Sequence, residues 1–348
     1  MQAALWCVGR RVRKKTRQTG MSGKVFYMEA PLPKTVHDVF YNSRGLRPGW
    51  RLAIFLLMVF GTAALVQFLV HLGGPTAPAS GSRASSPYMI PIGTGIAELV
   101  LFLVILLFSW IMSKIEHRSV GEYGLPVRKG VFTKFITGYV LWGFLPLVVL
   151  LSIMRLLGVF YFGNLSLHGK DIVIWGVLWG FMFLMVGFFE EYSFRGYALH
   201  TLIEGIGFWP AALIMALAFA RVHMGNGGET RVGIIATGVF ALFATAILRR
   251  TGDLWLAVGA HAGWDWGQTY FFGVNDSGLQ APGHLLNPSQ SGPAWLSGGS
   301  VGPEGSVLTL ILWSVMFVLF LVIYRGKSDP ELVVSTNPGT TFDAGRQS

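Results

Sequence analysis

Residues 52–72 read LAIFLLMVFGTAALVQFLVHL and contain no Asp, Glu, Lys or Arg. About 20 apolar residues are needed for a helix to cross the hydrocarbon core of a bilayer, so this run predicts a transmembrane helix. Further apolar runs occupy residues 93–113, 135–157, 172–194, 208–223, 233–248, 254–272 and 306–324. We therefore expect an all-α, polytopic membrane bundle of about eight transmembrane helices.

The composition excludes most soluble classes of protein. Hydrophobic residues make up 52% of the 348 residues and charged residues 13%, whereas a soluble domain is about 25% charged. A disordered chain, a coiled coil or an ordinary soluble enzyme would carry more charge. The single cysteine, Cys7, cannot form an internal disulfide. We expect an integral, multi-pass membrane protein surrounded by the lipid bilayer.

The positive charge lies beside the apolar runs. Residues 1–51 hold eleven Lys and Arg, the last of them Arg51, and two acids. This pattern favours a cytoplasmic segment attracted to anionic lipid headgroups over a nucleic-acid-binding face, so we expect no nucleic-acid partner. Polar sequence follows the first basic run, so we expect no signal peptide, and Met21 is an alternative start.

Lys and Arg in the loops predict the orientation of the chain. Residues 114–134 hold five of them and residues 273–304 none, which predicts that both termini are cytoplasmic; we expect a bacterial inner membrane. Gly, Ser and Pro are frequent in 273–304, so we expect an exposed, irregular loop. The predicted parts are a basic cytoplasmic segment over 1–50, a transmembrane helical domain over 51–325 and a polar tail over 326–348.

Ionisable side chains inside the apolar runs point to function, because a charge near the bilayer centre costs about 2.5–3.5 kcal/mol on insertion scales. Residues 188–196 read FFEEYSFRG. Glu191 and Arg195 have the i,i+4 spacing of an ion pair. Glu190 points about 100° away around the helix, has no local cation and suits a general base toward water. The alternative is a charge pair that reaches the membrane interface.

Two histidines lie in later apolar runs. His223 ends the run 208–223, where a lone histidine is more often an interfacial hydrogen-bonding group than a ligand. His261 and Asp265 share one helix face at i,i+4, so the acid can hold the imidazole in one tautomer or share a ligand site with it. Gly259 and Gly263 beside them predict the close approach of a neighbouring helix.

These side chains support two hydrolytic interpretations. Two histidines with one carboxylate form the zinc pattern that leaves a position open for water. Equally, Glu190 can activate water while the histidines bind the developing oxyanion. We expect an active site in an intramembrane cavity, open to the cytoplasm if Glu190 lies near that face. A simple topology separates Glu190 from His223, so they can meet only if one helix is offset, tilted or re-entrant.

Three motifs in order resemble those of the CAAX-protease and bacteriocin-processing family of intramembrane proteases, also called the Abi family. They are Glu190-Glu191-x-x-x-Arg195, Phe219-x-x-x-His223 and His261-x-x-x-Asp265. The resemblance covers roughly residues 115–272 and includes VGEYGL at 120–125. It implies an all-helical, eight-span enzyme that cleaves a peptide bond in or beside the membrane, in a peptide or a membrane-protein substrate.

The resemblance also implies a catalytic set, which comprises Glu190, Glu191, Arg195, His223, His261 and Asp265. In the family pattern, the first glutamate activates the attacking water, and the second, with the arginine, orders the site. The first histidine assists the water or binds metal; the second histidine and the last residue hold the scissile carbonyl oxygen or complete the metal site. The implied cofactor is one divalent metal, zinc, or none, and the metal ligands would be Glu190, His223 and His261.

Asp265 departs from the family, in which this position is often Asn. An amide can donate a hydrogen bond to an oxyanion, whereas an ionised carboxylate cannot. The departure favours a metal-binding or histidine-orienting role for Asp265. The alternative to an enzyme is a transporter or partner-binding scaffold whose buried charges form a structural network. The three ordered motifs and the lack of a visible internal repeat count against that alternative.

Overall fold

The computed structural model describes residues 18–19, 25–26, 36–43, 45–72 and 86–325. The predicted tail over 326–348 and most of the predicted basic segment over 1–50 lie outside the described residues. The chain forms two compact units, Met1–Ser43 and Arg44–Ser348. The first contains the antiparallel pair β1 (Gln18–Thr19) and β2 (Val25–Phe26), helix α1 (Val36–Phe40) and strand β3 (Tyr41–Asn42).

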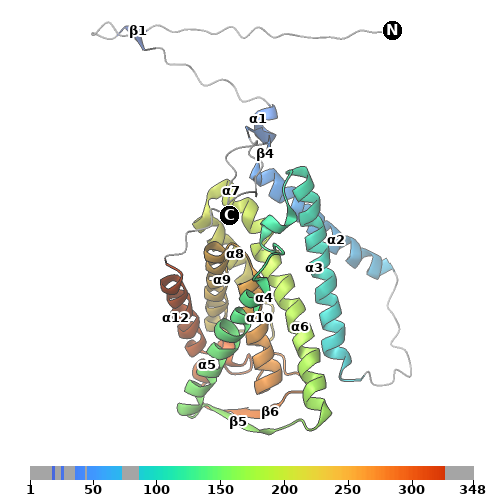
Figure 1. The fold of residues 1–348 in the computed structure, drawn as a ribbon, viewed down its shortest axis with the longest axis vertical. Coiled ribbons are helices and arrows are strands. Elements are labelled where there is room, and N and C mark those ends of the chain that lie inside the picture. The colour runs from blue at the N-terminus through green and yellow to red at the C-terminus, as the bar shows by residue number, and fades with distance from the viewer. Residues whose placement is uncertain (1–17, 20–24, 27–35, 44, 73–85, 326–348) are drawn as a thin grey trace, which may run out of the picture. The chain divides into compact units, whose positions relative to one another are not determined.

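Helices build almost all of the second unit (Figure 1). Its long helices are α2 (Pro48–Leu72), α3 (Met89–Ile115), α6 (Lys170–Arg195) and α9 (Arg231–Thr251). A further long run joins α4 (Val131–Thr137), the π-helix η2 (Gly138–Phe144) and α5 (Leu145–Leu156). The shorter elements are β4 (Gly45–Leu46), the 3-10 turn η1 (Val120–Tyr123), α7 (Tyr197–Ile206), α8 (Phe208–His223), α10 (Trp255–Trp266), the π-helix η3 (Gly267–Phe272) and α12 (Val307–Ile323).

Five helical segments of the described chain are long and apolar enough to cross a membrane. The helices α8 and α12 are apolar but shorter than these. The predicted count of eight spans is therefore not confirmed, although several helices fit a bilayer. Leu57, Val177 and Leu217 are 73%, 64% and 62% exposed on their outer faces, which a lipid surrounding tolerates and water does not.

Two short strands correct the expectation of a purely helical fold. Strand β5 (Phe160–Leu165) pairs antiparallel with β6 (Leu286–Gln290), which lies inside residues 273–304. Helix α11 (Ala294–Ser297) and the 3-10 turn η4 (Pro303–Gly305) follow in the same segment. Val274 and Val301 are buried. The prediction that 273–304 is exposed and irregular is wrong in part: residues 279–280 and 291–295 are exposed, but strand pairing and the buried valines fix the segment against the helices.

Helix α10 crosses the α4–η2 run at backbone contact. A Cβ added to Gly259 would lie 2.1 Å from the carbonyl oxygen of Phe135, and one added to Gly263 would lie 2.3 Å from that of Tyr139. Only glycine fits at both positions, which confirms the predicted close approach of a neighbouring helix. His261 lies two residues from each glycine, about 200° around the helix, and therefore faces away from this crossing toward α6.

Four charged residues whose side chains are 5–20% exposed form what we call the end cluster; they are Arg51, Glu116, Arg118 and Glu204. Arg51 Nη1 lies 2.6 Å from Glu116 Oε2, and its other terminal nitrogen contacts Glu204. Arg118 Nη2 lies 2.6 Å from Glu204 Oε1. Arg51 is the last cation of the basic segment expected to be attracted to lipid headgroups. It is 8% exposed and pairs with two protein carboxylates instead.

Candidate active site

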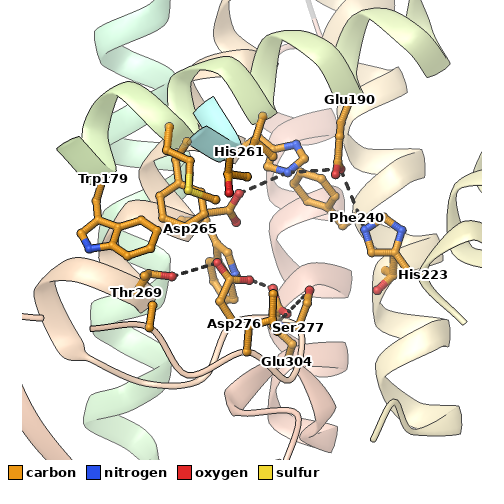
Figure 2. A pocket seen from close by; sticks show the side chains of 18 of the residues that line it. Trp179, Glu190, His223, Phe240, His261, Asp265, Thr269, Asp276, Ser277 and Glu304 are labelled. Atoms are coloured by element: carbon orange, nitrogen blue, oxygen red, sulfur yellow. Dashed lines mark hydrogen bonds and ion pairs between the residues drawn. The ribbon is translucent and has the colours of Figure 1, made fainter. Parts of the chain in front are cut away.

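A cavity of about 320 Å³ lies among α3, α6, α8, α9, α10, α12 and the 273–304 segment. Figure 2 shows the side chains that converge on it. Its ionisable lining residues are Glu190, His223, His261, Asp265, Asp276 and Glu304. The structure therefore brings four predicted site residues into one cavity. The lining also includes residues of 273–304, the segment that the loop charges predict to lie outside the cytoplasm. The opening toward the cytoplasm, expected if Glu190 lies near that face, stays a prediction.

The two adjacent glutamates of α6 point in different directions, as helix geometry predicts. The Glu190 side chain is 24% exposed and lines the cavity. The Glu191 side chain is fully buried, and its Oε1 lies 3.4 Å from Arg195 Nη1. The Arg195 guanidinium also lies 4.5 Å from the centre of the Phe219 ring. The predicted Glu191–Arg195 ion pair is thus confirmed within α6, and the guanidinium in addition contacts α8 through Phe219.

His261 receives its orientation from Glu191. Its Nδ1 lies 2.8 Å from Glu191 Oε1. The other ring nitrogen, Nε2, lies 3.6 Å from Glu190 Oε2 and 3.4 Å from Asp265 Oδ2. Three carboxylates therefore surround one imidazole. The sequence offered Asp265 as a residue that orients His261. In the structure Glu191 is better placed to do so, because its contact with the ring is the shortest of the three.

His223 is held by its own helix. Its Nδ1 lies 2.8 Å from the Phe219 carbonyl oxygen, which can only accept, so Nδ1 carries the proton and donates it. In the neutral form of this tautomer Nε2 keeps its lone pair, and this atom lies 3.9 Å from Glu190 Oε2. The imidazole thus presents an acceptor to the cavity next to the Glu190 carboxylate.

The structure explains how Glu190 and His223 reach the same depth. After α6 the chain continues through α7 and turns back at Gly207, whose φ is +84°. The rings of Phe194 on α6 and Phe219 on α8 pack edge to face with centres 5.0 Å apart. Glu190 lies one turn before Phe194, and His223 one turn after Phe219. Because α6 and α8 run in opposite directions, Glu190 and His223 lie at the same depth, one helical turn beyond the contact between Phe194 and Phe219.

One oxygen at the centre of this group lacks a hydrogen bond. Glu190 Oε2 is buried and accepts no hydrogen bond from the described residues. It faces Nε2 of His223 and Nε2 of His261 at 3.9 and 3.6 Å, both too long for direct hydrogen bonds. Figure 2 shows the carboxylate between the two rings. Polar contacts of this length suit a shared water molecule.

A comparison with family models matches residues 171–267 to the type II CAAX prenyl endopeptidase Rce1-like family. This segment is similar to that family, and we refer to it as the Rce1-like domain. It contains all three motifs and every predicted catalytic residue, and the match confirms the predicted family resemblance over this part of the chain. No curated protein and no solved structure matches the chain.

The metal ligands Glu190, His223 and His261 stay a prediction, because the described group whose possible ligand atoms all lie within 4.8 Å of one another is a different one, Asp265, Asp276 and Glu304. Zinc ligand atoms at 2.0–2.2 Å from a tetrahedral ion lie about 3.3–3.6 Å apart, close to the 3.6 and 3.9 Å that separate Glu190 Oε2 from Nε2 of His261 and His223. Metal-binding histidines usually donate their second N–H to a carboxylate or a carbonyl, as both rings do here. The distances from Glu190 to the two rings suit a metal ion or a water molecule, whereas the three predicted ligands together do not form such a close group.

Sequence reasoning missed two acids that line the cavity beside the Rce1-like domain. Residues 273–304 contain two acids, Asp276 and Glu304, and no Lys or Arg. Both acids line the cavity, and the lack of nearby cations is the sequence signal that could have identified them. Burial and the carboxylates of Asp265 and Glu304 raise the pKa of Asp276 well above its ordinary value. Sequence reasoning also missed Glu98 on α3, whose buried Oε2 has no hydrogen-bond partner among the described residues.

Proposed function

We propose that this chain is an intramembrane endopeptidase in which Glu190 activates the attacking water. The observation that carries the proposal is the orphaned Glu190 Oε2, which faces two histidine nitrogens inside a cavity. A carboxylate free of hydrogen bonds can accept a proton from water, which a neutralised one does poorly. The Rce1-like domain supports protease chemistry at this position.

In this mechanism a water molecule lies between Glu190 and His223. Glu190 Oε2 accepts one of its protons, while the unprotonated Nε2 of His223 accepts a hydrogen bond from the other and fixes the direction of the oxygen lone pair. That lone pair attacks the carbonyl carbon of the scissile peptide bond. Holding water, base and substrate together supplies part of the rate enhancement by reducing the entropy that is lost on reaching the transition state.

His261 stabilises the negative charge that develops on the carbonyl oxygen. As an imidazolium it donates through Nδ1 to Glu191 and presents Nε2–H to the cavity. The Glu191–Arg195 pair keeps the ring in this orientation. Donors aimed at a developing oxyanion typically contribute 10²–10³-fold each. Glu190 then returns its proton to the leaving amine as the C–N bond breaks, which restores the free enzyme.

A divalent metal is the alternative route to the same hydrolysis. Glu190, His223 and His261 would hold it, and it would supply Lewis-acid polarisation of the scissile carbonyl and activation of water. The orientation of both rings by their Nδ1 atoms serves either route equally. Asp265 would then be a neighbouring charge and not an oxyanion donor.

We further propose that the substrate is a membrane-anchored peptide or a membrane protein in the bilayer, and that both termini of this chain are cytoplasmic, in a bacterial inner membrane. The exposed apolar faces of the long helices support a lipid surrounding. The excess of Lys and Arg in 114–134 over 273–304 supports the orientation.

The test is proteolysis by the full chain in proteoliposomes that contain a library of lipid-anchored peptides, with new peptide termini identified by mass spectrometry. Wild type should cleave a subset, and Glu190→Gln, which preserves shape and removes the base, should cleave none. Glu122→Gln makes the same chemical change on an exposed loop and should cleave as wild type does. Cleavage by Glu190→Gln at the wild-type rate, or no cleavage by wild type, contradicts the proposal, and the latter favours a non-enzymatic scaffold.

A further inference from the structure

The ring of Phe240 lies against the imidazole of His261. Phe240 comes from α9, a helix that supplies none of the predicted catalytic residues. The two ring centres are 5.3 Å apart and the ring planes meet at 86°, which is the edge-to-face arrangement that aromatic pairs prefer. Phe240 also lines the cavity, and Figure 2 shows its ring next to the imidazole. Through this ring α9 contacts a predicted catalytic residue.

Hydrogen bonding alone leaves part of the His261 orientation open. Glu191 holds the Nδ1 atom at 2.8 Å. The Nε2 atom lies 3.4 Å from Asp265 Oδ2 and 3.6 Å from Glu190 Oε2, and both distances exceed the usual range for an N–H···O hydrogen bond. Because a hydrogen bond tolerates a departure from linearity of about 30°, the Nε2 side of the ring can swing about the Nδ1 contact. A second restraint has to come from packing.

Phe240 is itself held by a rigid support. Its ring packs against Trp313 of α12, with centres 4.9 Å apart, and Trp313 packs against Trp264 at 4.6 Å. Trp264 lies on α10, three residues after His261. The ring contacts from His261 through Phe240 and Trp313 to Trp264 therefore begin and end on α10. Close-packed rings have little room to turn, so Phe240 offers His261 a fixed surface.

We propose that Phe240 is a positioning residue that keeps Nε2 of His261 pointed into the cavity at the reacting carbonyl group. This inference rests on the proposed proteolytic function. It holds for either hydrolytic route, because an oxyanion donor and a metal ligand both need Nε2 in the same place. An error of about 1 Å in the position of a catalytic group can cost about 10²-fold in rate. Phe240 therefore acts on kcat through His261 and not through the substrate.

The test compares two substitutions of Phe240 in the full chain, in proteoliposomes with a lipid-anchored peptide that wild type cleaves. Phe240→Leu keeps an apolar side chain and removes the flat ring. Its kcat per folded molecule should fall about tenfold, typical of losing a group that orients a catalytic histidine, while KM changes by less than about twofold. Phe240→Tyr keeps the ring and should retain at least about half of the wild-type kcat.

Phe243→Leu is the matched control, since it makes the same chemical change three residues further along α9. Phe243 also packs against Trp313, at 5.6 Å, but it is not among the described residues that line the cavity. It is 0% exposed, against 9% for Phe240, so Phe243→Leu should lower the unfolding midpoint at least as much as Phe240→Leu does. The kcat of its folded molecules should match wild type.

Four results would overturn the inference. They are a wild-type kcat in Phe240→Leu, a loss that lies entirely in KM, a kcat in Phe240→Tyr as low as in Phe240→Leu, and an equal loss of kcat in Phe243→Leu. The second would place Phe240 in the substrate-binding surface, and the fourth would make it part of the general core. Cleavage that depends on Glu190 but not on Phe240 removes this inference and leaves the proposed function, whereas no cleavage by wild type removes both.

Discussion

The protein buries two groups of charged side chains, and they differ in how the charges are matched. In the end cluster two arginines face two glutamates, and each carboxylate has a cation within 2.6 Å. Among the described residues that line the cavity, the carboxyl groups of Glu190, Asp265, Asp276 and Glu304 are accompanied by two histidines and by no Lys or Arg, and Glu190 Oε2 has no hydrogen bond from a described residue.

The difference separates structure from chemistry. In the end cluster the positive and negative charges compensate one another, which leaves little charge to bind a ligand. The role of the cluster is therefore to join α2, α3 and α7. An unmatched cluster is costly to bury and is stable only when the rest of the fold imposes it. Buried charge without a compensating partner is typical of sites that act on another molecule. Neutralising one residue in each group should therefore have opposite consequences.

The largest effect should follow Glu190→Gln. Proteolysis of lipid-anchored peptides should fall by about 10³-fold, within the range for loss of a general base, while the thermal unfolding midpoint of the protein in detergent should stay the same or rise, because an uncompensated charge is removed. A loss of activity that tracks a lower unfolding midpoint would show that the carboxylate is structural.

The opposite result should follow Arg51→Met in the end cluster. Removing the cation leaves Glu116 and Glu204 with less compensation, so the free energy of unfolding should fall by about 3 kcal/mol, measured by chemical denaturation in mixed micelles. The turnover of the molecules that remain folded should match wild type. Arg51→Met combined with Glu204→Met removes one charge of each sign and should recover part of the stability; if it recovers none, the loss is one of packing rather than of charge balance.

A smaller effect should follow Glu191→Gln, which links the two kinds of cluster. Glu191 is paired with Arg195, as in the end cluster, but it also orients His261. The kcat should fall by about 10–100-fold, typical of removing a residue that orients a catalytic histidine, and KM should change little. An equal rise in KM would instead indicate that Glu191 shapes substrate binding.

The smallest effect should follow Tyr197→Phe. The Tyr197 hydroxyl donates to Glu116 Oε1 at 2.5 Å, and Arg51 still neutralises that carboxylate in the variant. The free energy of unfolding should fall by about 1.5 kcal/mol, typical of one hydrogen bond to a charged group, and proteolysis should be unchanged. A loss as large as that of Arg51→Met would place the tyrosine at the centre of the cluster.

The sequence predicted the core of the site because that information is local. Glu190, His223 and His261 interrupt apolar runs, and a charge in such a run is conspicuous without any knowledge of the fold. The i,i+4 spacing of Glu191 and Arg195 likewise predicted a pair that the structure contains. The four-residue spacing of Gly259 and Gly263 is also local information, and it predicted the close helix crossing.

The features that the sequence did not predict depend on contacts between distant segments of the chain. Asp276 and Glu304 reach the cavity because β6 pairs with β5, more than 100 residues earlier in the chain. Arg51 finds its partners 65 and 153 residues away. The depth of His223 depends on where the chain turns at Gly207. None of these pairings leaves a periodic signal in the sequence, so composition alone made 273–304 look exposed and Arg51 look lipid-facing.

The central claim, that Glu190 and His223 act on one water molecule, is tested most directly by a double-mutant cycle on proteolysis. Glu190→Gln, His223→Ala and the double variant are compared with wild type in the same proteoliposomes. Residues that act as a unit give non-additive losses, so the double variant should be no slower than Glu190→Gln alone. Losses that multiply in the double variant would show that the two side chains act independently and would contradict the account.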